Sequence, residues 1–226
     1  MMKEEKVIQW KIKAVTITRG PKPAAYLAIL YSSKKEHSME FLDKLVNMIP
    51  CLKTLLKSLI ANEIVFLDKD KVFIKDLARF VYKALDEGCP LEEVVEMLTW
   101  KEFEELCSQV ISQYSYEVLR NFRFKIHGKR HEVDIVGIKS NIILSVDCKQ
   151  WFRLSGGISK AALKHWERTT RLADYFKYKG YKFNHVFPIL IVYKDLSTKV
   201  LYRTFIVPFH KLKKFLEEID VYYVTL

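Results

Sequence analysis

Three ionisable residues in the middle of the chain have types and spacing suited to phosphate chemistry. Asp147 and Lys149 are two residues apart at the end of an apolar run, and Asp134 lies shortly before them. Two carboxylates can hold a divalent cation, which polarises a phosphate and lowers the pKa of a bound water. A lysine can orient that water or neutralise charge that develops on the phosphate. The group therefore predicts metal-dependent phosphodiester hydrolysis with these three residues at the reaction centre.

Two neighbouring strands are needed to bring these residues together. Residues 131–138 and 142–149 are predicted strands joined by a short turn, so they are antiparallel neighbours and Asp134 lies beside Asp147. Side chains alternate along a strand, which puts Asp147 and Lys149 on one face and leaves an apolar face for the core. The backbone carbonyl of Cys148 is then a further candidate metal ligand.

The flanking segments predict an α/β domain around these strands. Thr99 to Glu102 fits a capping box that begins a helix, and that helix runs to about Tyr114. The other predicted elements are strands 117–126, 185–193, 200–207 and 221–225, and helices 158–178 and 209–219. Strand 185–193 is nearly all apolar, as expected for a buried central strand. The pattern is that of a sheet covered by helices.

The order of these motifs resembles a known superfamily. A helix containing Phe103-Glu104-Glu105-Leu106, a hairpin, Val133-Asp134 and then Asp147-Cys148-Lys149 resembles the PD-(D/E)xK nucleases, nearest to Mrr-type restriction endonucleases and archaeal Holliday-junction resolvases. The resemblance covers about residues 100–195, and Val133 stands where the superfamily name implies Pro.

This resemblance implies a fold, a cofactor and residue roles. The fold would be a restriction endonuclease-like α/β/α domain with a central mixed sheet. Glu104, Asp134 and Asp147, with the Cys148 carbonyl, would hold Mg²⁺, for which Mn²⁺ would substitute, and Lys149 would assist the attacking water. Cleavage would leave a 5′-phosphate and a 3′-hydroxyl.

Each of these residues also has a simpler interpretation. Asp147 and Lys149 would form an ordinary cross-strand charge pair if that face were solvated. Glu104 would be a solvent-facing helix residue, and its neighbour Glu105 has the same chemistry. Glu132 is either an extra ligand or a charge on the sheet face.

Basic residues near this group are candidates for nucleic-acid contacts. The candidates are Arg123, Lys125, Lys129, Arg130, Gln150, Lys160, Lys164 and Arg168. The alternatives are an amphipathic edge strand for the first four and a solvated helix face for the last three. Trp151, Phe152 and Trp166 would stack on bases or pack in the core, and His165 beside the helical stripe is interpreted as a packing or surface residue.

The first part of the chain predicts a second, smaller domain. A strand at 7–17 precedes three helices, at 23–31, 38–48 and from Pro50. Segments 64–67 and 71–74 flank Asp68-Lys69-Asp70 and predict a hairpin, which a helix at 75–87 follows. This order resembles a winged helix in layout. We therefore expect a winged-helix-like domain at 1–98 and a nuclease domain at 99–226, giving an α/β protein overall.

The charge distribution favours a polyanionic partner for the second domain. Residues 1–98 hold 16 Lys+Arg against 14 Asp+Glu, whereas residues 99–226 hold 22 against 13. The four cysteines form no CxxC pair and are interpreted as reduced thiols of a cytoplasmic protein. No apolar run is long enough to span a bilayer.

The sequence thus predicts a Mg²⁺-dependent DNA nuclease, an endonuclease acting in restriction or on DNA repair and recombination structures. Two alternatives remain open: a non-catalytic DNA-binding or docking protein on a nuclease-like scaffold, and a subunit active only with a helicase or other repair partner. Junction resolution would require a homodimer. Lys53 and Lys57 on the third helix leave open whether the first domain binds DNA or a protein.

Overall fold

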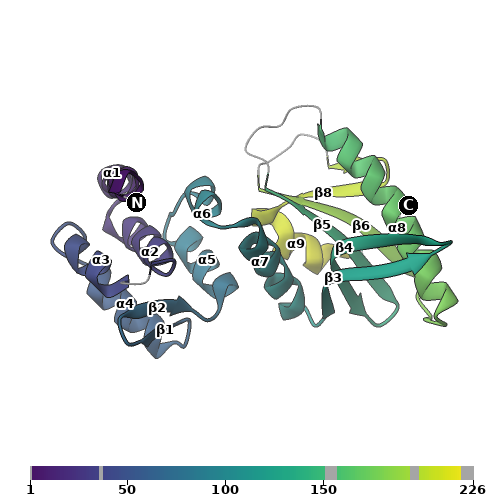
Figure 1. Ribbon diagram of the computed structural model, residues 1–226, viewed down its shortest axis with the longest axis horizontal. Coiled ribbons are helices and arrows are strands. Elements are labelled where there is room, and N and C mark those ends of the chain that lie inside the picture. The colour runs from purple at the N-terminus through teal and green to yellow at the C-terminus, as the bar shows by residue number, and fades with distance from the viewer. Residues whose placement is uncertain (1, 36–37, 151–156, 194–198, 220–226) are drawn as a thin grey trace. The chain divides into compact units, whose positions relative to one another are not determined.

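The computed structural model describes residues 2–35, 38–150, 157–193 and 199–219, and it divides the chain into two compact units (Figure 1). Unit 1 is Met1–Thr99 and unit 2 is Trp100–Leu226. No helix among the described residues is long and apolar enough to cross a membrane.

Unit 1 is mostly helical. Its elements are α1 (Met2–Arg19), α2 (Pro21–Ser32), α3 (Ser38–Leu45), α4 (Leu52–Ala61), β1 (Val65–Asp68), β2 (Lys71–Ile74), α5 (Leu77–Asp86) and α6 (Leu91–Met97). Helix α2 is its centre, because the side chains from Pro23 to Ser32 are all buried. Three helices and the antiparallel hairpin β1–β2 thus follow one another in the expected order.

The predicted strand at 7–17 is wrong, because these residues belong to helix α1. Ile12 and Val15 are buried and Ile8 is half-buried, which is the spacing of one helix face. Trp10, which would share one face of a strand with Ile8 and Ile12, is 71% exposed. A period near 3.6 therefore describes the burial of this segment better than a period of two.

Unit 2 is an α/β domain. Its elements are α7 (Trp100–Gln113), β3 (Glu117–Ile126), β4 (Lys129–Lys139), β5 (Ile142–Lys149), α8 (Gly157–Tyr178), β6 (His185–Val192), β7 (Val200–Leu201), β8 (Thr204–Pro208), the 3-10 helix η1 (Phe209–Lys211) and α9 (Leu212–Glu218). Within the described residues the strands form a six-stranded sheet in the order β3-β4-β5-β6-β8-β7. The predicted α/β class with a central mixed sheet is confirmed.

The sheet changes direction at β5. Strand β5 pairs antiparallel with β4 and parallel with β6, and α8 is the crossover between β5 and β6. Helices α7 and α9 cover one face of the sheet and α8 covers the other (Figure 1). Strand β5 is buried from Ile142 to Cys148, so Lys149 is where it first reaches partial exposure.

One predicted strand is two strands in the structure. The prediction at 200–207 is divided into β7 and β8, which pair with each other across Tyr202 and Arg203. Both turn residues have positive φ, 47° and 60°, which is the conformation that a tight two-residue hairpin requires. The predicted last strand, 221–225, lies outside the described residues.

Candidate active site

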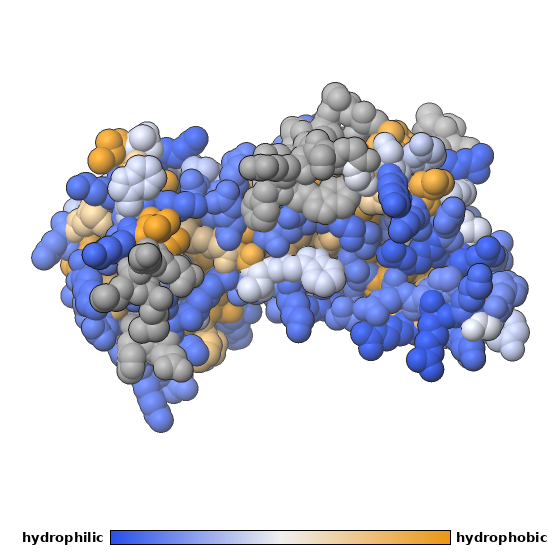
Figure 2. Space-filling model, turned by 45° about the horizontal axis from the view of Figure 1, so that its top comes forward, coloured by the Kyte–Doolittle hydropathy of each residue, from blue (hydrophilic) through white to orange (hydrophobic). Residues whose placement is uncertain are grey.

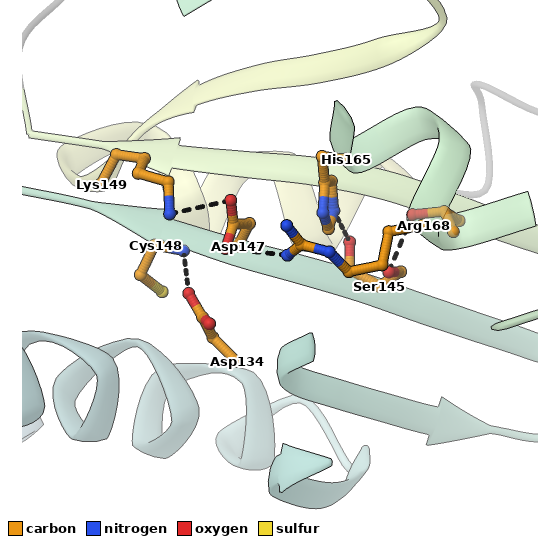
Figure 3. Close-up of polar contacts among 8 residues, drawn as sticks. Asp134, Ser145, Asp147, Cys148, Lys149, His165 and Arg168 are labelled. Carbon is orange, nitrogen blue, oxygen red and sulfur yellow. Dashed lines mark hydrogen bonds and ion pairs between the residues drawn. The ribbon is translucent and has the colours of Figure 1, made fainter. Parts of the chain in front are cut away.

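The pairing of β4 with β5 brings the two aspartates together. Ile135 pairs with Val146 in the antiparallel register, so Asp134 lies directly opposite Asp147. Residues opposite each other on antiparallel strands project to the same face of the sheet. Asp134 is also held by the backbone, because the amide N–H of Cys148 donates to its Oδ2 over 2.9 Å (Figure 3).

Strand β3 is distorted beside Asp134. It pairs Arg120 with Ile135 and Phe122 with Val133, which leaves Asn121 opposite Asp134. Asn121 has a φ of 49°, a left-handed conformation that asparagine tolerates better than most side chains. The ladder is therefore irregular at the position of the carboxylate, as often occurs beside functional sites.

Both carboxylate oxygens of Asp147 have cationic partners (Figure 3). Lys149 Nζ lies 2.9 Å from Oδ2, and Arg168 Nη1, from α8, lies 3.4 Å from Oδ1. Asp147 itself is only 3% exposed. The solvated-pair interpretation of Asp147 and Lys149 therefore does not describe this aspartate, which is a buried charge in contact with two cations.

The two aspartates have pKa values shifted in opposite directions. Burial raises the pKa of Asp134 to about 7, and the nearby negative charge of Asp147 adds to the effect. Burial would also raise the pKa of Asp147, but a hydrogen bond from Asp134 and the positive charge of Lys149 hold it below its usual value. Asp134 therefore holds a proton up to about pH 7, whereas Asp147 is ionised well below that pH.

Glu104 reaches the same region from α7. It is 4% exposed, and its Oε1 has no hydrogen-bond partner among the described residues. Burial raises the pKa of Glu104, whereas the charges of Arg120 and Lys149 lower it and that of Asp147 raises it. Glu104 is thus a buried acid that is electrostatically linked to the aspartate pair rather than a solvent-facing helix residue. Its neighbour Glu105 pairs with Arg120 over 3.8 Å.

A glycine allows α7 to approach the sheet closely. A Cβ on Gly137 would lie 3.2 Å from a methyl of Ile111 and 3.3 Å from the ring of Tyr116. Beside this contact, the buried thiols of Cys107 and Cys148 are hydrogen-bonded to each other, and this bond and their burial raise the pKa of Cys148. The apolar face of β5 is therefore packed directly against α7.

Helix α8 is attached to β5 through a buried polar group. His165 Nε2 lies 2.8 Å from the carbonyl oxygen of Ser145, and the Thr169 hydroxyl donates to Ser145 Oγ over 2.9 Å. Burial lowers the pKa of His165 to about 4, so the ring is neutral at pH 7 and donates through Nε2. Its Nδ1 has no partner among the described residues. His165 is thus a packing residue, as expected.

The residues predicted to contact nucleic acid occupy three places. Lys125, Lys129 and Arg130 are exposed on the β3–β4 hairpin, together with Arg123, which pairs with Glu132 over 2.8 Å. Lys160 and Lys164 are exposed on α8, and Gln150 is half-buried after β5. Arg168 differs from this group because it contacts Asp147. Glu132 pairs with Arg123 and is a charge on the sheet rather than a member of the aspartate pair.

One face of unit 2 is mostly hydrophilic (Figure 2). On the face shown in Figure 2, the described part of unit 2 is covered mostly by hydrophilic side chains, with few hydrophobic ones. On the hairpin, Arg123, Lys125 and Arg130 line a depression of about 560 Å³ together with Phe124 and His131. Trp166 packs under the guanidinium of Arg203 at 5.4 Å, whereas Trp151 and Phe152 lie outside the described residues.

The donors near Asp147 fit a hard divalent cation better than a structural metal. Among the described residues, no three His, Cys, Asp or Glu side chains form a ready-made metal cluster. Mg²⁺ does not need one, because it is commonly held by one or two carboxylates and keeps several waters. A cation beside Asp147 would replace the proton of Asp134, and Glu104 supplies a buried oxygen without a partner among the described residues.

Two residues of this site, Ser145 and Thr169, were not predicted from the sequence, and neither was the ion pair of Arg168 with Asp147. Ser145 could have been found from the sequence, because it is a polar residue in an apolar strand and lies two residues before Asp147, on the same face. The contact of Arg168 with Asp147 had no local signal, because it depends on how α8 packs against the sheet.

Comparisons with known proteins give a limited picture. No protein family model matches the chain. An uncharacterized protein of Archaeoglobus fulgidus is 26% identical over 129 residues, which cover 55% of this chain and 95% of that protein. Protein VC1899 from Vibrio cholerae matches 90% of this chain at 13% identity with a TM-score of 0.39.

A second solved structure is the small subunit of the heterodimeric restriction endonuclease R.BspD6I. It matches 54% of this chain at 16% identity with a TM-score of 0.31. The chain covers 57% of VC1899 and 61% of the small subunit, less than two thirds of each. These distant likenesses do not assign an activity to the chain.

Proposed function

We propose that unit 2 is a divalent-metal-dependent nuclease of the PD-(D/E)xK type that hydrolyses phosphodiester bonds in DNA. The observation that carries this proposal is the position of Asp134 opposite Asp147, with Lys149 Nζ 2.9 Å from Asp147 at the end of β5. The basic hairpin and the basic face of α8 support a nucleic-acid substrate.

Asp134 and Asp147 would hold the cation, with Glu104 and the carbonyl of Cys148 as further oxygen donors. The chemistry supplied by a bound Mg²⁺ or Mn²⁺ is polarisation of a phosphate oxygen and acidification of a water. The raised pKa of Asp134, about 7, supports this assignment, since a bound cation would favour the charged form of this buried carboxylate.

Lys149 would act on the phosphate and on the water. Its ammonium group is partly exposed and is directed by the ion pair with Asp147, so it can donate hydrogen bonds beside the carboxylates. In hydrolysis, the water oxygen bonds to phosphorus, the bond from phosphorus to the 3′ oxygen breaks, and that oxygen takes up a proton. The products are a 5′-phosphate and a 3′-hydroxyl.

A cleavage assay with isosteric variants tests the proposal. Asp147→Asn and Lys149→Met each remove one charge with little change in size. We expect each to lower the cleavage rate about 100-fold or more, because a positioned charge or proton-transfer group typically contributes that much. Labelled single-stranded, duplex, flap and four-way-junction DNAs and an RNA are incubated with Mg²⁺, Mn²⁺ or EDTA.

Glu167→Gln is the matched control, since Glu167 is an exposed acid on α8. Its cleavage rate should equal that of the unmodified protein, and circular dichroism should show that all three variants fold. Cleavage that persists in Asp147→Asn and Lys149→Met would contradict the assigned site. Salt-sensitive binding of these nucleic acids without any cleavage would instead favour a non-catalytic or partner-dependent protein.

A further inference from the structure

Arg168 is directed at the candidate active site rather than at solvent. It lies on α8 among the exposed basic residues Lys160, Lys164 and Arg171, but its guanidinium turns inward to Asp147 Oδ1 (Figure 3). The side chain remains 29% exposed, so part of the guanidinium is accessible to a bound ligand.

The position of Arg168 is fixed by the packing of α8 on β5. His165 and Thr169, three residues before and one residue after it, both bind Ser145 through buried hydrogen bonds. Ser145 is two residues from Asp147 and therefore projects to the same face of β5. The helix is thus held in a register that aims Arg168 at Asp147.

The contact of Arg168 with Asp147 is the weaker of the two ion pairs. Its separation of 3.4 Å exceeds the usual range for a charge-assisted hydrogen bond, whereas Lys149 approaches to 2.9 Å. A divalent cation at the carboxylates would repel the guanidinium and compete with it for Asp147. A planar guanidinium that leaves a carboxylate is well suited to bind a phosphate, because its paired N–H donors match both groups.

On the basis of the proposed function, we infer that Arg168 is a phosphate-binding residue that exchanges Asp147 for a backbone phosphate of the nucleic acid when a divalent cation binds. Cation binding and substrate binding at this site are therefore coupled through one side chain. With a cation held by Asp134 and Asp147, the Arg168 guanidinium would leave Asp147 and be free to bind a phosphate of the substrate.

Two binding measurements on one set of variants test this coupling. Arg168→Gln removes the charge, and Arg171→Gln, on the next turn of the same helix and exposed, is the matched control. Mn²⁺ affinity is measured by calorimetry, and binding of a labelled DNA duplex is measured by fluorescence anisotropy in Ca²⁺ and in EDTA. Binding is thereby read independently of cleavage.

We expect opposite effects of Arg168→Gln on the two ligands. Mn²⁺ should bind severalfold more tightly, because the competing cation is gone. DNA should bind about tenfold more weakly in Ca²⁺ and nearly unchanged in EDTA, since a charged hydrogen bond typically contributes that much. Arg171→Gln should leave Mn²⁺ affinity unchanged and weaken DNA binding equally in both conditions.

Three results would overturn the inference. Weaker Mn²⁺ binding in Arg168→Gln would show that Arg168 only positions Asp147. Equal DNA affinity in all variants would show that the ion pair of Arg168 with Asp147 has no part in DNA binding. If Arg168→Gln fails to fold, Arg168→Lys replaces it. The inference predicts that Arg168→Lys loses the increase in DNA affinity that Ca²⁺ gives the unmodified protein, and an unchanged increase overturns it.

If the unmodified protein cleaves DNA while these tests fail, the inference alone is wrong. Absence of cleavage by the unmodified protein with every substrate and metal would contradict the proposed function instead.

Discussion

Asp134 and Asp147 are chemically identical side chains that their surroundings make different. Burial disfavours the charged form of both, but Lys149 and a hydrogen bond from Asp134 favour the charged form of Asp147. Asp134 forms no ion pair with the described lysines and arginines, so it takes the proton. Such a separation of pKa values between neighbouring acids is characteristic of catalytic and metal-binding sites.

The raised pKa of Asp134 makes the stability of unit 2 depend on pH. The folded protein holds this proton more tightly than the unfolded chain, so the stabilisation is complete below pH about 4 and is lost as the pH rises through about 7. In EDTA, the free energy of unfolding should fall by about 1–3 kcal/mol between these limits, since one pKa unit corresponds to about 1.4 kcal/mol. The lowered pKa of Asp147 makes stability rise with pH, but this effect falls at pH values below the usual pKa of an aspartate and therefore outside the range from about 4 to about 7.

Asp134→Asn should remove this decline, which urea unfolding at a series of pH values would measure. Glu167→Gln, the exposed acid on α8, should keep it. An equal decline in Asp134→Asn and in the unmodified protein would show that another group causes the pH dependence.

The same carboxylate pair should make the effect of Mg²⁺ on stability depend on pH. Above pH about 7 both aspartates are ionised, so Mg²⁺ held there would meet two negative charges and would stabilise the fold by binding only the folded state. We expect Mg²⁺ to raise the Tm more at pH about 8 than at pH about 5.5, by calorimetry. Asp147→Asn should abolish the difference, and a shift of equal size in that variant would place the cation elsewhere.

At the scale of elements, α8 is held on β5 by contacts that surround the aspartate. Ser145, His165 and Thr169 are all buried, so their hydrogen bonds cannot be replaced by water without local opening. This polar group fixes the register of the helix, and Leu172 and Phe176 of the same helix pack in an apolar cluster with residues of β3, β4 and β5.

Two adjacent threonines on α8 provide a matched test of this attachment. Thr169→Val keeps the shape of the side chain but leaves the buried Ser145 hydroxyl without its partner, so we expect a loss of about 1–3 kcal/mol in unfolding free energy. Thr170→Val changes an exposed side chain that bonds within its own helix and should stay within about 0.5 kcal/mol of the unmodified protein. Urea unfolding measures both, and equal losses would exclude a special role for the contact with Ser145.

At the scale of the whole molecule, the two compact units differ in charge. Unit 1 carries 16 Lys+Arg against 14 Asp+Glu and unit 2 carries 22 against 13, since the boundary residue Thr99 is uncharged. Large apolar side chains are exposed on both units, for example Trp10 and Ile17 on α1 and Leu163 and Tyr178 on α8. The difference in charge places the expected phosphate contacts mainly on unit 2.

Matched charge reversals distinguish the two units. Lys160→Glu/Lys164→Glu on α8 should weaken DNA binding about tenfold or more and reduce the dependence of log Kd on log salt by about two, one for each phosphate contact. Lys53→Glu/Lys57→Glu on α4 makes the same change of charge on unit 1 and should have little effect. Fluorescence anisotropy over a salt series measures both, and a larger effect of the α4 pair would favour a DNA-binding winged helix.

Much of unit 2 could be predicted from the sequence because local patterns decide it. The apolar alternation of residues 142–149 fixes which side chains share a face, so Asp147 and Lys149 are together in β5 as expected. The prediction was wrong where one segment fits both a strand period and a helix period. Residues 7–17 alternate like a strand, but the burial of Ile12 and Val15 against the rest of unit 1 selects the helix.

The sequence by itself determined the order of α7, β3, β4, β5, α8 and β6, the face that Asp147 shares with Lys149, and the excess of positive charge. Only the tertiary structure decided that Glu104 is buried, that Arg168 turns inward to Asp147 and that the amide of Cys148 holds Asp134. The physical reason is the separation along the chain of the residues that determine each feature. The periodicity of a strand or helix is set within a few residues, whereas register and the approach of α7 and α8 to the sheet depend on packing between segments distant in the chain.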